Sequence, residues 1–137
     1  MEKARTVVLT VLAVLGTMGI AQGAAIKELQ GAWALDGSSC DDIFKKVGKK
    51  IEFKDRIAPT STGLLFTGNK VAGPMAICTI TQVRKKSSRW SAYLSCETSM
   101  VVEELTIGFD LPSSSHLRRF DLFGADPYAT YQKCEFQ

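Results

Sequence analysis

Short stretches in which apolar and polar residues alternate recur from residue 29 to near the end of the chain. Alternation with a period of two is typical of β-strands that bury one face. Clusters of glycine, proline, asparagine and serine separate the stretches, as expected for turns. One of these turn regions covers residues 69–74. The predicted strands cover residues 29–37, 49–56, 64–68, 76–83, 89–97, 99–111, 117–123 and 128–136.

One segment has helical character instead. Ser38 and Ser39 are good N-caps, aspartates follow them, and lysines precede Gly48. This order of charges suits the helix dipole, and glycine commonly ends a helix. The pattern predicts a helix of about two turns over residues 40–47, short enough to depend on packing against the rest of the fold.

The stretch 76–97 predicts an antiparallel hairpin with a cysteine near each end. A symmetric pairing places Cys78 opposite Cys96 and Arg84 opposite Trp90. The apolar residues and both cysteines then share one face. Because a slip of one residue would put the cysteines on opposite faces, the register is well specified.

This pairing predicts a Cys78–Cys96 disulfide, which leaves Cys40–Cys134 by elimination. An even number of cysteines in a small exported chain is typical of disulfides. The rival connectivity, Cys40–Cys78 with Cys96–Cys134, remains open from sequence. No cysteine pair has the C-x-x-C spacing of a zinc site, so no metal is expected.

The pattern as a whole predicts a mainly β fold. Many short strands separated by turn signals are typical of a small antiparallel barrel or sandwich, here with one short helix and two disulfides. No internal repeat, low-complexity tract or linker interrupts the sequence. We therefore expect a single domain over residues 24–137.

The N-terminal segment predicts export. Lys3 and Arg5 form a short positive region, residues 6–20 are almost wholly apolar, and small residues at 21–23 suit a cleavage site. These three parts are typical of a secretory signal peptide, assigned here to residues 1–23. The alternative is a membrane anchor, but the apolar core is shorter than the about 20 residues that a spanning helix needs. We expect a periplasmic or secreted protein with no membrane span after cleavage.

Charge and composition exclude some classes of function. The chain carries a net charge of +3, and loss of Glu2, Lys3 and Arg5 leaves about +2. Nucleic-acid-binding domains are usually far more basic, so no nucleic-acid partner is expected. No glycine-rich phosphate loop, haem-attachment motif or calcium loop is present, so no cofactor is expected.

Candidate catalytic residues are few. His116 is the only imidazole and lies beside Ser113, Ser114 and Ser115, but adjacency in a turn supplies no orienting acid. The acidic residues at 103 and 104 are adjacent on a predicted strand, so their side chains point to opposite faces and cannot act as a pair. We expect no catalytic residues and no enzyme activity.

Basic doublets are the remaining feature. They occur at 45–46, 49–50, 85–86 and 118–119, and two arginines extend the third of these. Such doublets usually form solvated surface. Because a hairpin tip projects, the best candidate for partner binding is the tip cluster, defined as Arg84, Lys85, Lys86 and Arg89.

The segment Gly31-Ala32-Trp33 near the start of a small exported β-rich chain resembles the G-x-W signature of lipocalin-like barrels. The resemblance implies that Trp33 closes one end of a barrel and that Arg118 or Arg119 packs over it. Among bacterial proteins the chain is similar to small lipocalin-like metalloprotease inhibitors. It departs from them in having four cysteines and a helix after the G-x-W strand. The wider pattern is similar to uncharacterised small exported bacterial proteins.

These observations favour a non-enzymatic binding or interaction module of the bacterial cell envelope. The expected partner is a protein or an anionic envelope component, and the chain is expected to be a monomer. The alternative is a periplasmic or secreted inhibitor of a protease or lysozyme, and a small hydrolase is a remote third hypothesis.

Overall fold

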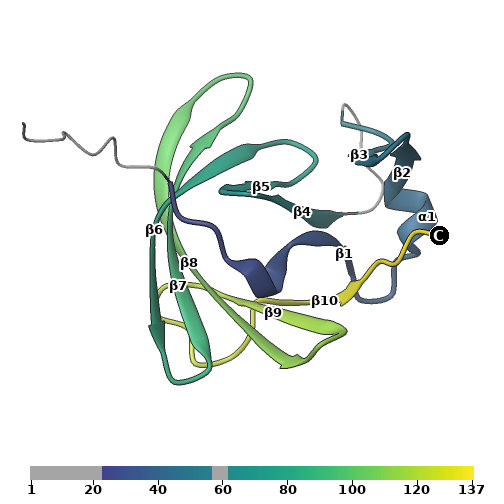
Figure 1. Cartoon of the computed structure of the whole chain (residues 1–137). Coiled ribbons are helices and arrows are strands. Elements are labelled where there is room, and N and C mark those ends of the chain that lie inside the picture. The colour runs from purple at the N-terminus through teal and green to yellow at the C-terminus, as the bar shows by residue number, and fades with distance from the viewer. Residues whose placement is uncertain (1–22, 57–61) are drawn as a thin grey trace, which may run out of the picture.

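The computed structural model describes residues 23–56 and 62–137, which form a closed antiparallel barrel of eight strands (Figure 1). The order around the barrel is β1-β10-β9-β8-β7-β6-β5-β4, and β4 pairs with β1 to close it. The architecture is therefore a barrel rather than a sandwich. Its strands are β1 (Gly31–Leu35), β4 (Gly63–Thr67), β5 (Lys70–Ala72), β6 (Ile77–Lys86), β7 (Arg89–Glu97), β8 (Val102–Ser113), β9 (His116–Phe120) and β10 (Ala129–Lys133).

The barrel interior holds the main hydrophobic core. Along β7 every second residue is buried, from Trp90 to Cys96, and Leu105, Ile107 and Phe109 continue the pattern on β8. This alternation is the one that the sequence predicts for strands with one buried face. Strand β5 was not predicted, because its residues fall in the stretch 69–74 that was expected to be a turn. With three residues and one buried side chain, Val71, it is too short to show alternation.

The β6–β7 hairpin confirms the first part of the predicted register. Cys78 pairs with Cys96 as expected, but a β-bulge follows Ile80. Beyond the bulge Lys85 pairs with Trp90, so the predicted pairing of Arg84 with Trp90 is wrong.

The bulge has a physical cause in the turn. The turn consists of two residues, 87 and 88, with Ser87 at φ 55, and it fixes a pairing one residue out of step with that of the cysteines. The extra residue, Thr81, is accommodated in the bulge, where its hydroxyl donates to the Tyr93 carbonyl at 3.1 Å. The bulge also turns Val83 towards the core, whereas the symmetric pairing would place it on the face opposite the cysteines.

An insertion between β1 and β4 differs most from the sequence prediction. The helix α1 (Cys40–Ile43) is a single turn, and the chain then forms a hairpin of β2 (Phe44–Val47) and β3 (Lys50–Phe53). The predicted helix up to residue 47 is therefore wrong. Gly48, at φ +62, serves as a hairpin turn residue instead of ending a helix. Pairing brings the rings of Phe44 and Phe53 within 5.0 Å of each other, a contact that a helix would not make.

This insertion packs against the outer wall of the barrel. The side chains of Ile43, Phe44 and Phe53 form a second core with Ala32 and Ala34 of β1. Figure 1 shows the C-terminal end of the chain beside α1. The Cys40–Cys134 disulfide joins these two segments, so the insertion is attached to the barrel both covalently and by burial.

The two ends of the barrel differ. Successive strands are antiparallel, so β1, β5, β7 and β9 all finish at one end, here called the open end, at Leu35, Ala72, Glu97 and Phe120. At the opposite, closed end the 3-10 helix η1 (Lys27–Leu29) precedes β1. Ile26 and Leu29 are buried there, and Gln30 exchanges two hydrogen bonds with the backbone of Gly68.

Both predicted disulfides, Cys40–Cys134 and Cys78–Cys96, are formed, which excludes the rival connectivity. Paired cysteines indicate an oxidising compartment outside the cytoplasm. In the described part of the chain, no helix is both long and apolar enough to span a bilayer. The predicted signal peptide falls almost wholly outside the described residues.

Candidate functional site

A cavity of about 170 Å³ lies inside the barrel towards its open end. The strands β4, β5, β7 and β8 supply the apolar lining with Leu64, Val71, Leu94, Leu105, Ile107 and Phe109. These residues face inwards because they occupy alternate positions of their strands. The sequence therefore builds the cavity from the same pattern that builds the core.

The Cys78–Cys96 disulfide forms part of the cavity wall. It crosslinks two directly paired residues of β6 and β7 on the inner face. This crosslink holds the two strands together next to the open end.

Two charged residues also line the cavity, Glu103 on β8 and Arg119 on β9. Each lies one residue from the end of its strand that faces the open end. Glu103 is exposed, as expected for a carboxylate at the entrance, whereas its neighbour Glu104 lies on the outer wall. The prediction that these two acids point to opposite faces is therefore confirmed.

Arg119 is the more unusual of the two charged residues. Its guanidinium lies 5.0 Å from the centre of the Tyr128 ring, and its Nε is buried with no hydrogen-bond acceptor among the described residues. Tyr131 of β10 lies nearby. Burial raises the pKa of the Tyr131 hydroxyl, while the positive charge of Arg119 acts in the opposite direction.

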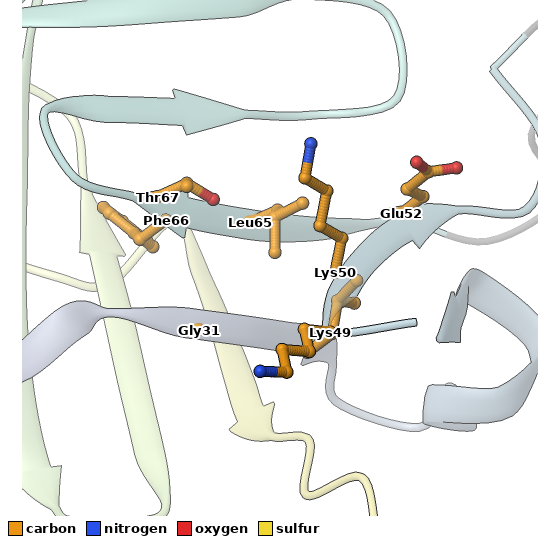
Figure 2. A pocket seen from close by; sticks show the side chains of 8 residues that line it. Gly31, Lys49, Lys50, Glu52, Leu65, Phe66 and Thr67 are labelled. Atoms are coloured by element: carbon orange, nitrogen blue, oxygen red, sulfur yellow. The ribbon is translucent and has the colours of Figure 1, made fainter. Parts of the chain in front are cut away.

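A second hollow, of about 400 Å³, lies outside the barrel and is here called the outer groove. Its walls are the β2–β3 hairpin on one side and β1 and β4 on the other (Figure 2). Leu65 of β4 is part of the lining. Figure 2 shows that the side chains of Lys49 and Lys50 extend in different directions. Two ammonium groups that diverge in this way do not form a clamp for one anion.

The tip cluster is divided by the structure. Lys85 lies 4.4 Å from the centre of the Trp90 ring, and Arg84, Lys85 and Lys86 are exposed. Arg89 instead packs on the outer wall, 3.5 Å from the centre of the Phe120 ring, and donates to the Gly124 carbonyl. Partner binding by the exposed members stays a prediction.

Trp33 lies at the closed end, where its Nε1 donates to the Leu29 carbonyl at 2.8 Å. The cation over its ring is Lys133, at 4.9 Å, rather than the expected Arg118 or Arg119. Arg118 points to the outer wall and forms two hydrogen bonds with Asp110, which raise the pKa of its guanidinium.

His116 lies in the exposed β8–β9 turn with the serines that flank it. The hydroxyls of Ser113 and Ser115 both lie within 3.1 Å of the same nitrogen, Nδ1. A catalytic triad instead uses one imidazole nitrogen for the nucleophile and the other for an acid. The cluster therefore lacks the arrangement that activates a serine.

Sequence reasoning assigned Arg119 to the end of the barrel that Trp33 closes and missed its place in the cavity. The available signal was Leu117, two residues earlier, which is fully buried and sets the inward phase of β9.

Among residues 23–56 and 62–137, no group of three or more His, Cys, Asp or Glu side chains is placed to hold a metal ion. No protein-family model, curated protein or solved structure matches the chain.

Proposed function

We propose that the protein is an exported, non-enzymatic binding protein of the bacterial cell envelope that holds a small, largely apolar ligand inside its barrel. The observation that carries this proposal is the apolar cavity at the open end. Small-molecule sites are typically concave and apolar with few polar groups, and the entrances of β-barrels are a common location.

The size of the cavity limits the ligand. An engineered apolar cavity of about 150 Å³ binds benzene. The present cavity, at about 170 Å³, suits one aromatic ring or a short aliphatic chain. A ligand of several fused rings exceeds this space.

The chemistry of the lining favours binding over catalysis. The lining cysteines are joined in a disulfide and offer no thiolate nucleophile. Export is supported by the disulfides and by the three-part pattern of the N-terminal segment.

A protease or lysozyme inhibitor is the second candidate function, because apolar side chains are exposed at the open end. Met75, Met100, Val101 and Val102 lie in or beside the β5–β6 and β7–β8 turns, and Met100 is 88% exposed. Exposed apolar residues gathered in one region are typical of surfaces that bind another protein. This candidate predicts stoichiometric inhibition of an envelope protease or of lysozyme by the purified protein.

Two neighbouring leucines of β4 separate the cavity from the outer groove. Leu64 lines the cavity, Leu65 lines the outer groove, and both are half-buried. The experiment is an NMR titration with toluene of the full chain, expressed with its own N-terminal segment and purified in the oxidised form. Leu64→Trp fills the cavity, and Leu65→Trp is the matched control.

We expect toluene to shift the methyl resonances of cavity residues such as Ile107, and Leu64→Trp to abolish these shifts. Leu65→Trp should leave them unchanged. If toluene causes no saturable shift in the wild-type protein, the proposal is wrong. The opposite ranking of the two variants would move the site to the outer groove.

A further inference from the structure

The ligand class can be narrowed by Arg119, an inference that rests on the proposed function. Within β9, Leu117 and Arg119 face inwards and Arg118 faces outwards. In the sheet Arg119 pairs with Phe109 and Ala129, both of which belong to the core or pack against it. A guanidinium therefore projects into a wall that is mostly apolar, with Glu103 at its entrance.

The two neighbouring arginines differ in how their charges are balanced. Arg118 forms a two-point ion pair with Asp110, with oxygens at 2.7 and 2.8 Å. Arg119 forms no ion pair with any carboxylate among the described residues, and its buried Nε donates to no acceptor there. Its guanidinium lies over the Tyr128 ring and donates a hydrogen bond to the Tyr131 hydroxyl, so both described partners are uncharged.

Arg119 is half-buried and its Nε is fully buried, so part of its charge is removed from water without an anion to balance it. Transfer of a charge from water into an apolar site is unfavourable, and a hydrogen-bonded partner of opposite sign compensates. Among the described residues that line the cavity, Glu103 is the only carboxylate, and it is exposed and lies beyond ion-pair distance of Arg119. The structure thus supplies the cation of a pair inside the cavity without the anion.

We infer that the ligand is a small monocarboxylate whose apolar part fills the cavity and whose carboxylate pairs with Arg119. The planar guanidinium fork matches the geometry of a carboxylate. A single cation balances one negative charge, and Glu103 at the entrance repels a second. The site therefore favours acids of the size of benzoate or hexanoate over phosphate dianions.

Four probes of similar shape test this inference in the oxidised full chain by calorimetric titration. Benzoate carries the carboxylate, benzamide and toluene are uncharged, and phenyl phosphate carries up to two charges. We expect benzoate to bind about ten- to hundredfold more tightly than benzamide, since hydrogen bonds to charged groups contribute about 1.5–3 kcal/mol. Phenyl phosphate should bind more weakly than benzoate.

Three variants isolate the role of the charge. Arg119→Met should reduce benzoate affinity by about tenfold or more and leave toluene affinity within about twofold. Glu103→Gln should raise benzoate affinity a few-fold, because a repulsive charge is removed. Lys54→Met, at an exposed position just after β3 and outside every proposed site, is the matched control and should change neither affinity.

The outcomes separate this inference from the proposed function. If toluene binds but benzoate gains nothing over benzamide, the carboxylate inference is wrong and the cavity function stands. An unchanged benzoate affinity in Arg119→Met, with toluene binding intact as the check on folding, also overturns it. If Arg119→Met fails to fold, Arg119→Lys replaces it. Loss of the preference for benzoate over phenyl phosphate in Arg119→Lys would support a two-point contact between the Arg119 guanidinium and the carboxylate. Absence of binding by all four probes overturns both proposals.

Discussion

The two disulfides provide a quantitative prediction, because they close loops of very different length. The perturbation is replacement of both members of one pair by alanine, as Cys40→Ala with Cys134→Ala or as Cys78→Ala with Cys96→Ala. The paired residues are separated by 94 and 18 positions, respectively. In the chain-entropy model these loops correspond to about 4.7 and about 3.2 kcal/mol at 25 °C.

These free energies translate into melting temperatures. For a domain of this size, 1 kcal/mol shifts Tm by about 4 °C, so the expected losses are about 19 °C and about 13 °C. Loss of side-chain packing, by contrast, destabilises the Cys78/Cys96 variant more than the Cys40/Cys134 variant. Cys78 and Cys96 are both buried, whereas Cys40 is only half-buried. Replacing Cys78 and Cys96 by alanine therefore leaves the larger cavity, which reduces the expected difference in Tm between the two variants.

The assay is thermal unfolding at neutral pH, followed by circular dichroism, with rescans to establish reversibility. We expect the Cys40/Cys134 variant to unfold at the lower temperature. If the Cys78/Cys96 variant unfolds at the same or a lower temperature, packing inside the barrel rather than loop entropy dominates, and the reasoning is refuted.

Three further predictions concern single residues. Gly63→Ala should destabilise the fold by more than about 2 kcal/mol in urea titrations, because its Cβ would lie 2.5 Å from the Trp33 carbonyl oxygen, and an unchanged midpoint would contradict this close packing. Arg118→Met should lower the urea midpoint more than Asp110→Asn. Loss of Arg118 leaves the carboxylate of Asp110 charged in a buried site, whereas loss of the Asp110 charge leaves an arginine that is 39% exposed. Equal losses in the two variants would contradict this reasoning. Burial raises the pKa of Tyr131, so one tyrosinate absorbance step should occur above pH 10 and disappear in Tyr131→Phe. The folded state then holds a proton that the unfolded state has lost, so stability should fall as pH rises from about 10 through the raised pKa, and a pH-independent midpoint there would contradict the shift.

Much of the barrel could be predicted from local alternation. Each long strand has a run of inward apolar residues, such as Leu105, Ile107 and Phe109 on β8, although Val101 of the same predicted strand is exposed. The helix prediction failed at Phe44, where charge order and a terminal glycine suited both a helix and a hairpin. Burial of Phe44 against Phe53 and the outer wall favours the hairpin.

The candidate site was harder to predict, because its residues come from strands far apart in the sequence. Arg119 was a visible candidate, but the sequence assigned it to Trp33 by resemblance. Only closure of the barrel places Lys133 over Trp33 and leaves Arg119 at the other end, beside the cavity. The groove beside the β2–β3 hairpin was equally invisible, since the hairpin itself was not predicted.

The sequence by itself determined which face of most long strands is buried, and it favoured the Cys78–Cys96 pair while leaving the rival connectivity open. Cys78 and Cys96 lie on the same alternating face of one hairpin, and side-chain alternation is a local property of the backbone. The tertiary structure alone decided the bulge at Thr81, the β2–β3 hairpin after α1 and the place of Arg119 in the cavity lining, where no described carboxylate pairs with it. Each of these depends on contacts between distant segments, which set the free energy of a conformation but leave no local pattern in the chain.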